Sequence, residues 1–115
     1  MKHLREYKAA SEYERTLLVR CRSALKEIDP SAEIILYGSR ARGDADPESD
    51  YDLLILTDGD VNLKKEDLFR RQLFPIEIEA GAVFTVILLS RKEWNSPLYR
   101  AMPFCQNIKR DGVIL

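Results

Sequence analysis

The first 28 residues carry an apolar side chain at about every third or fourth position. This spacing is typical of an amphipathic helix, in which 3.6 residues make one turn. The apolar positions are Leu4, Tyr7, Tyr13, Leu17, Leu18, Cys21, Leu25 and Ile28. The Asp29-Pro30 pair ends the pattern, since a residue that precedes proline avoids the helical conformation. We therefore predict one long helix over residues 2–28 that covers a sheet.

Three short apolar runs rich in β-branched residues predict the strands of that sheet. The runs cover residues 33–37, 51–57 and 82–89. A polar loop over residues 44–48 separates the first two, so we expect these strands to be antiparallel, as in a hairpin with a large insert. Asp58 and Asp60 follow the second strand and are typical turn formers rather than additional ligands.

Two further helices complete the predicted elements. Asn62 is a plausible N-cap for a helix that Pro75 interrupts or kinks and that ends by Gly81. Ser90-Arg91-Lys92-Glu93 has the form of a capping box. The last helix, over residues 97–109, carries four apolar residues on one side: Leu98, Met102, Cys105 and Ile108.

The apolar tail at residues 113–115 has two interpretations, because it either tucks into the core or joins a partner surface. Trp94, Tyr99 and Phe104 are open to the same two interpretations, as core residues or interface anchors. The alternation of helices and strands, within 115 residues, predicts a single domain of the α/β (α+β) class.

Composition limits the classes of function. The chain is 45% hydrophobic and 32% charged, with a net charge of −1, which is typical of a soluble globular protein and disfavours tight non-specific nucleic-acid binding. No apolar run approaches the ~18 residues of a membrane span. Cys21 and Cys105 are expected in the core, which fits a reducing cytoplasm, and the lone His3 is expected at the surface.

The candidate chemistry begins directly after the first predicted strand, at Gly38-Ser39-Arg40-Ala41-Arg42-Gly43. Gly38 lacks a Cβ, so its backbone can approach a phosphate closely, and Ser39 offers a hydroxyl and an N–H. A helical turn over residues 39–43 would point further N–H groups at the anion. Arg40 and Arg42 lie in a segment that we expect to be largely solvent-exposed, where they either bind phosphate or serve solubility.

Asp50 and Asp52 open the next predicted strand. Alternate residues of a strand share a face, so the two carboxylates converge on one point. Buried side by side they would repel each other, and a cation removes that cost. Hard oxygen ligands of this kind suit Mg²⁺, which typically takes one or two protein carboxylates together with substrate phosphates.

These residues resemble the signature of the minimal nucleotidyltransferases of the polymerase-beta superfamily: Gly-Ser, a glycine a few residues later, and Asp-x-Asp at the start of the next strand. The matching positions are Gly38, Ser39, Gly43, Asp50 and Asp52. The resemblance implies a small mixed sheet flanked by helices. It also implies Mg²⁺-dependent transfer of a nucleoside monophosphate from a nucleoside triphosphate to an acceptor, with Asp50 and Asp52 as catalytic metal ligands.

Small stand-alone members of this family are often encoded beside a helical HEPN protein, as the antitoxin half of a toxin-antitoxin pair. The resemblance therefore allows a HEPN-type partner that accepts the nucleotide. The sequence also leaves open whether the chain forms a homo-oligomer.

The family also has a third carboxylate on a later strand, and residues 82–89 contain no acid. Thr85 or Val83 stands where this ligand is expected, and a threonine hydroxyl supplies no charge to hold a second metal. Glu77 and Glu79 lie just upstream and are candidates to replace it, although the charged face of that helical stretch is expected to be solvated. Two further functions consequently stay open beside the transferase: a weakened relative that binds a partner protein, and a metal-dependent phosphohydrolase.

Overall fold

The computed structural model describes residues 1–115 and contains one five-stranded mixed sheet, as the resemblance implied. The strand order is β1-β5-β2-β3-β4. The strands are β1 (Lys2–His3), β2 (Glu33–Tyr37), β3 (Tyr51–Thr57), β4 (Phe84–Ser90) and β5 (Val113–Ile114). β2 and β3 are antiparallel, as predicted, and β3 and β4 are parallel. This arrangement brings the start of β3 and the start of β4 to the same end of the sheet.

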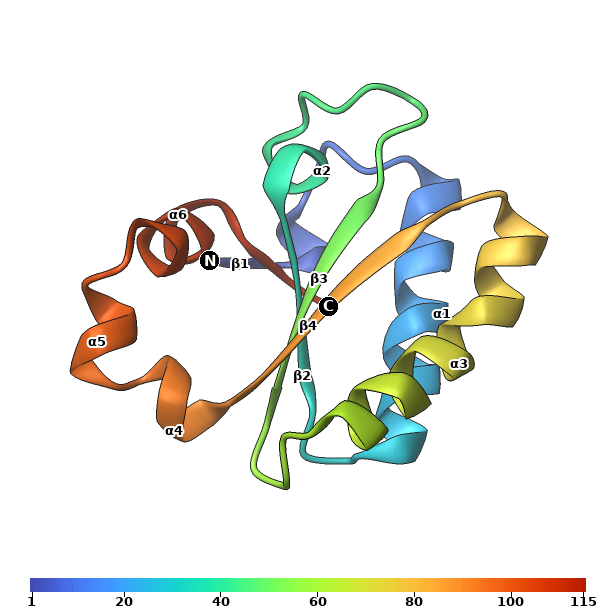
Figure 1. Ribbon diagram of the computed structural model, residues 1–115. Coiled ribbons are helices and arrows are strands. Elements are labelled where there is room, and N and C mark those ends of the chain that lie inside the picture. Colours follow the sequence, from blue (N-terminus) through green and yellow to red (C-terminus); the bar gives the residue numbers. More distant parts are fainter.

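Helices α1 (Glu12–Ile28) and α3 (Leu63–Ala80) lie side by side against one face of the sheet (Figure 1). The short helices α4 (Arg91–Trp94), α5 (Pro97–Arg100) and α6 (Pro103–Asp111) lie on the opposite side. Strand side chains alternate between the two layers: Leu53 and Ile55 belong to the larger core with α1 and α3, while Leu54 and Leu56 pack with Trp94, Cys105 and Ile108.

The N-terminal segment differs from the prediction, because α1 begins at Glu12 and not at residue 2. Residues 2–3 form β1, and a 3-10 turn, η1 (Leu4–Glu6), follows. Ser11 caps α1 in a capping box with Glu14. Arg15 donates to the carbonyl oxygens of Leu4, at 2.6 Å, and Tyr7. These hydrogen bonds hold the N-terminal segment against α1, although the segment is not part of the helix. Tyr13, which was expected on the apolar side of the helix, is 60% exposed.

Helix α3 is uninterrupted, and Pro75 lies inside it. The Asn62 side chain accepts a hydrogen bond from the Lys65 N–H at 2.8 Å, which confirms the predicted cap. Gly81, at φ +66°, ends the helix in the left-handed conformation that glycine allows.

The C-terminal part also corrects the prediction. β4 begins at Phe84 rather than at residue 82, and the single helix expected over residues 97–109 is two helices. Pro103 has no N–H to continue a helix and instead begins α6. Leu98, expected on the apolar side, is 72% exposed.

The chain end belongs to the sheet. β5 lies between β1 and β2, and Val113 is fully buried, which confirms the interpretation in which the tail joins the core. Trp94 is likewise a core residue, Cys21 and Cys105 are buried free thiols, and His3 is exposed, as expected. None of the helices combines the length and apolar character needed to cross a membrane.

Candidate active site

The turn after β2 places Gly38 against Asp52. The helix α2 (Gly38–Arg42) begins directly at the strand end, one residue earlier than predicted, and Gly43 at φ +79° ends it. Gly38 has φ +75°, and a Cβ at this position would overlap Oδ2 of Asp52. Both facts require glycine here. The fold thus brings Gly38 and Asp52, two of the predicted site residues, into contact across the loop that separates them in the sequence.

Asp52 lies between two neighbouring strands. It pairs with Tyr37 across the antiparallel ladder and with Thr85 across the parallel one. The Thr85 hydroxyl donates a hydrogen bond to Oδ1 of Asp52 at 2.5 Å. Of the two expected positions for the missing acid, it is therefore Thr85 that lies beside Asp52.

The face of the sheet on which Asp52 lies is open at this end. Tyr51 points into the larger core, so Asp52 points to the side of α4, α5 and α6. Leu54 and Leu56, further along the same face, are covered by α4 and α6. Asp52 is half-buried and Thr85 is exposed, so a ligand can reach the carboxylate from solvent.

Asp50 is exposed and lies one residue before β3. The peptide groups on both sides of it are held by hydrogen bonds. The Ser49 carbonyl accepts from Arg40, at 3.2 Å from Nε and 2.8 Å from Nη2. The Tyr51 N–H donates to the Val83 carbonyl at 2.9 Å.

Arg40 and Arg42 have different surroundings, although both were expected to be largely exposed. The Arg42 side chain is 47% exposed and lies 3.3 Å from the Asp44 carboxylate. The Arg40 side chain is only 13% exposed, which corrects the expectation. Its guanidinium also donates to the Pro47 carbonyl at 2.9 Å and lies 4.3 Å from the centre of the Tyr51 ring.

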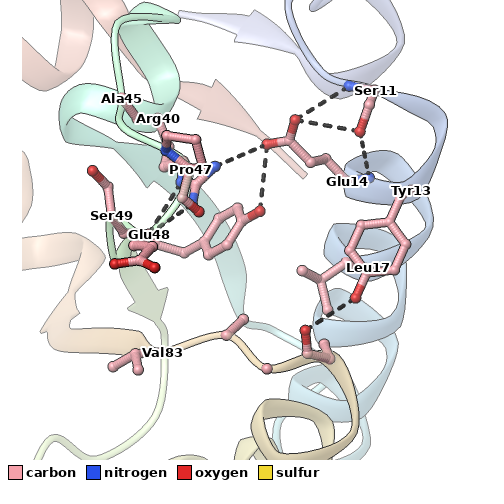
Figure 2. Close-up of a pocket in the computed structure, with 14 residues that line it drawn as sticks. Ser11, Tyr13, Glu14, Leu17, Arg40, Ala45, Pro47, Glu48, Ser49 and Val83 are labelled. Carbon is pink, nitrogen blue, oxygen red and sulfur yellow. Dashed lines mark hydrogen bonds and ion pairs between the residues drawn. The ribbon is translucent and has the colours of Figure 1, made fainter.

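A pocket of about 690 Å³ lies behind Arg40, between the start of α1, the loop over residues 44–49 and the turn from α3 to β4. Figure 2 shows Glu14 pointing from α1 towards Arg40, with Oε2 3.5 Å from Nη1. Tyr51 also donates to this carboxylate at 3.4 Å. Burial, followed by the negative charge of Glu14, raises the pKa of Tyr51, so its hydroxyl stays protonated at neutral pH.

The role of Glu14 was not predicted. The Ser11-x-x-Glu14 spacing is a capping-box signal that would have placed the start of α1, although it gives no indication of the contact with Arg40. Of the predicted site residues, Arg40 lines this pocket, together with Val83, the alternative position for the third ligand. Gly38 and Arg42 line a separate pocket of about 150 Å³ between α2 and α6. Phe104 packs edge-on against Tyr37 beside the smaller pocket, with ring centres 5.6 Å apart.

Glu77 and Glu79, the two candidates to replace the third acid, are engaged elsewhere. Glu77 accepts from the Phe84 N–H at 2.9 Å, and Glu79 pairs with Arg20 at 2.5 Å. No group of three or more His, Cys, Asp or Glu side chains is arranged to hold a metal. The donor set of Asp50, Asp52 and the Thr85 hydroxyl fits one hard divalent ion that completes its shell with water and phosphate oxygens. It lacks the charge for a two-metal centre.

Comparisons with known proteins identify the family. Residues 18–114 match the family described as "Nucleotidyltransferase domain". The chain is 32% identical over 112 residues to a Methanocaldococcus jannaschii protein named "Putative protein adenylyltransferase MJ0604", covering 97% of this chain and 99% of that protein. A solved structure of a toxin-antitoxin with AMP-PNP shares the fold, with a TM-score of 0.59 and 17% identity over 84% of this chain and 69% of the other.

The family match spans most of the chain and includes the Gly38 turn, Asp50, Asp52 and the strand that carries Thr85. The curated relative has nearly the same length. The protein therefore belongs to the nucleotidyltransferase domain family, as a minimal nucleotidyltransferase.

Proposed function

We propose that this chain binds a magnesium–nucleoside triphosphate and transfers the nucleoside monophosphate to a hydroxyl group of a protein. The observation that carries the proposal is the position of Asp52, against the Gly38 turn on one side and beside Thr85 on the other. In this proposal Asp50 and Asp52 hold Mg²⁺, which supplies positive charge to the phosphate oxygens.

The nucleotide phosphates would be bound by the segment over residues 38–43. Gly38 and Gly43 shape its two ends, Ser39 contributes its hydroxyl, and Arg42 contributes an exposed guanidinium. In the transfer, the acceptor oxygen forms a bond to the α-phosphorus. The bond from that phosphorus to the β-phosphate oxygen breaks, pyrophosphate leaves with the electron pair, and the hydroxyl proton passes to solvent.

A protein acceptor is supported by the Methanocaldococcus jannaschii relative, whose name is "Putative protein adenylyltransferase MJ0604". Adenine nucleotide and a second protein are both consistent with the toxin-antitoxin structure that contains AMP-PNP. The acceptor in this proposal is a helical HEPN-type toxin for which this chain is the antitoxin.

A second candidate function is supported by Thr85. Since a neutral hydroxyl stands beside Asp52 in place of an acid, the chain is alternatively a weakened relative that binds nucleotide and acts by complexing its partner. In this second candidate function, the partner is either another protein or a second copy of this chain.

Calorimetric titration of ATP and GTP, with and without Mg²⁺, tests the site. We expect magnesium-dependent binding that is lost in the Asp50→Asn, Asp52→Asn double variant. Asp46→Asn is the matched control, because Asp46 is an exposed acid of the same loop. No binding by folded wild-type chain would refute the nucleotide proposal. Label transfer from α-labelled triphosphate to the partner then separates the enzyme from the binding module, and release of free monophosphate without labelled protein would indicate a hydrolase.

A further inference from the structure

We infer that Arg40 is a positioning residue for Asp50 rather than a ligand of the nucleotide phosphates. The inference rests on the proposed function, because it assigns a role within the same site. It starts from the contrast between two arginines two positions apart: Arg42 is exposed, and Arg40 is largely enclosed by protein.

The donors of the Arg40 guanidinium are occupied by the protein itself. Nε and Nη2 donate to the Ser49 carbonyl, Nη2 also donates to the Pro47 carbonyl, and Nη1 faces the Glu14 carboxylate. An arginine has five N–H donors in a fixed planar fork. With this fork directed at the loop, little donor capacity is left for a phosphate group.

The bonds to Ser49 act directly on the candidate metal ligand. The Ser49 carbonyl belongs to the peptide unit that joins Ser49 to Asp50, and a peptide unit is planar. Two hydrogen bonds from Arg40 therefore fix the plane before Asp50. The bond from the Tyr51 N–H to the Val83 carbonyl fixes the plane after it. With both planes held, Asp50 retains mainly its side-chain torsions.

The loop has few other restraints. Residues 44–49 contain no helix or strand. Two backbone hydrogen bonds involve this loop. The Asp44 N–H donates to the Ser39 carbonyl at 3.2 Å, and the Ser49 N–H donates to the Asp46 carbonyl at 3.0 Å. Arg40 itself is fixed by Glu14 and by the Tyr51 ring beneath it. It therefore links the start of α1 to the loop that delivers Asp50.

The test compares Arg40→Gln with Arg42→Gln in the full chain, with the exposed Arg71→Gln as a control. Three quantities are measured: Mn²⁺ affinity by electron paramagnetic resonance, ATP affinity without divalent metal by calorimetry, and hydrogen exchange of residues 44–50. For Arg40→Gln we expect Mn²⁺ affinity to fall about tenfold or more, as for other residues that orient a metal ligand. Exchange should quicken in residues 44–50 alone, and metal-free ATP affinity should stay within about twofold. Arg42→Gln should instead weaken metal-free ATP binding.

A loss of metal-free ATP affinity in Arg40→Gln, with Mn²⁺ affinity and exchange unchanged, would make Arg40 a phosphate ligand and overturn the inference. No change in any of the three quantities would overturn it as well. If Arg40→Gln does not fold, Arg40→Lys keeps the charge but loses the fork, and the same pattern is expected with smaller changes. If the wild-type chain binds neither ion nor nucleotide, the proposed function fails, and the exchange data alone report whether Arg40 orders the loop.

Discussion

The Thr85 hydroxyl donates a 2.5 Å hydrogen bond to Oδ1 of Asp52, across the parallel pair of β3 and β4. One oxygen of Asp52, a candidate metal ligand, therefore accepts from a neutral hydroxyl. Thr85 stands at the position where the family resemblance implies a third acid. Thr85 therefore adds no negative charge for a cation beside Asp52.

Thr85→Asp should raise Mn²⁺ affinity by about tenfold or more, since affinity rises with the number of charged ligands. Without metal, the new carboxylate beside Asp52 should lower the melting temperature through like-charge repulsion, and Mg²⁺ should restore it. Metal titration and thermal unfolding measure both effects. Thr85→Asn is the control, because it removes the hydroxyl without adding charge. An unchanged or lower affinity in Thr85→Asp would contradict the prediction.

Gly38→Ala should lower the free energy of unfolding by about 1–3 kcal/mol, because the backbone has a positive φ and the added Cβ meets Asp52. It should also abolish magnesium-dependent nucleotide binding. Gly81→Ala provides a matched control: Gly81 has φ +66°, but a Cβ there meets nothing within 4 Å. That variant should lose stability and keep binding. Equal binding by the two variants would show that the contact between Gly38 and Asp52 is unimportant for the site.

Asp29→Asn should destabilise the protein by about 3 kcal/mol at pH 7, because it leaves the Lys65 ammonium, whose side chain is only 17% exposed, without its counter-charge. Asp29 lies at the other end of the sheet, where Oδ2 is 2.6 Å from Lys65 Nζ and also accepts from Thr57. Urea unfolding of the wild type and the variant at pH 7 measures this difference. A loss below about 1 kcal/mol would indicate a solvated pair.

The stability of the wild type should depend on the protonation of Asp29. Burial raises the pKa of this carboxyl, but hydrogen bonds from Lys65, Thr57 and Ser31 outweigh burial and hold the pKa well below its ordinary value. The contribution is therefore complete above the unfolded-state value of about 3.9 and is lost as the pH falls further. Unfolding measured from pH 7 to pH 2 should show the difference between wild type and Asp29→Asn shrinking only below about pH 4.

Ser11→Ala should lower the free energy of unfolding by about 1 kcal/mol, the usual effect of removing an N-cap. Ser11 caps α1 and contacts the Glu14 carboxylate that faces Arg40. Chemical denaturation measures the loss. Ser23→Ala, a change inside the same helix, should have no comparable effect, and equal losses in the two variants would contradict a capping role.

The pairing of β2 with β3 and the cap and end of α3 followed from local patterns. The apolar runs, Asn62 and Gly81 each determine structure within a few residues, through strand burial, side-chain capping and positive φ. The error at the N-terminus had a long-range cause. The prediction of one helix from residue 2 failed because Lys2 and His3 pair with the C-terminal strand β5, more than a hundred positions away.

The sequence by itself determined that a glycine turn after one strand meets Asp52 at the start of the next, since strand alternation and the hairpin bring the two to one end of the sheet. Only the tertiary structure decided the roles of their neighbours. Arg40 and Arg42 are equivalent in the sequence, and they differ because Glu14 and the carbonyls of the loop lie within reach of one guanidinium and not of the other. Hydrogen-bond partners depend on distance in space, and for a long flexible side chain that distance is fixed only when the whole chain has packed.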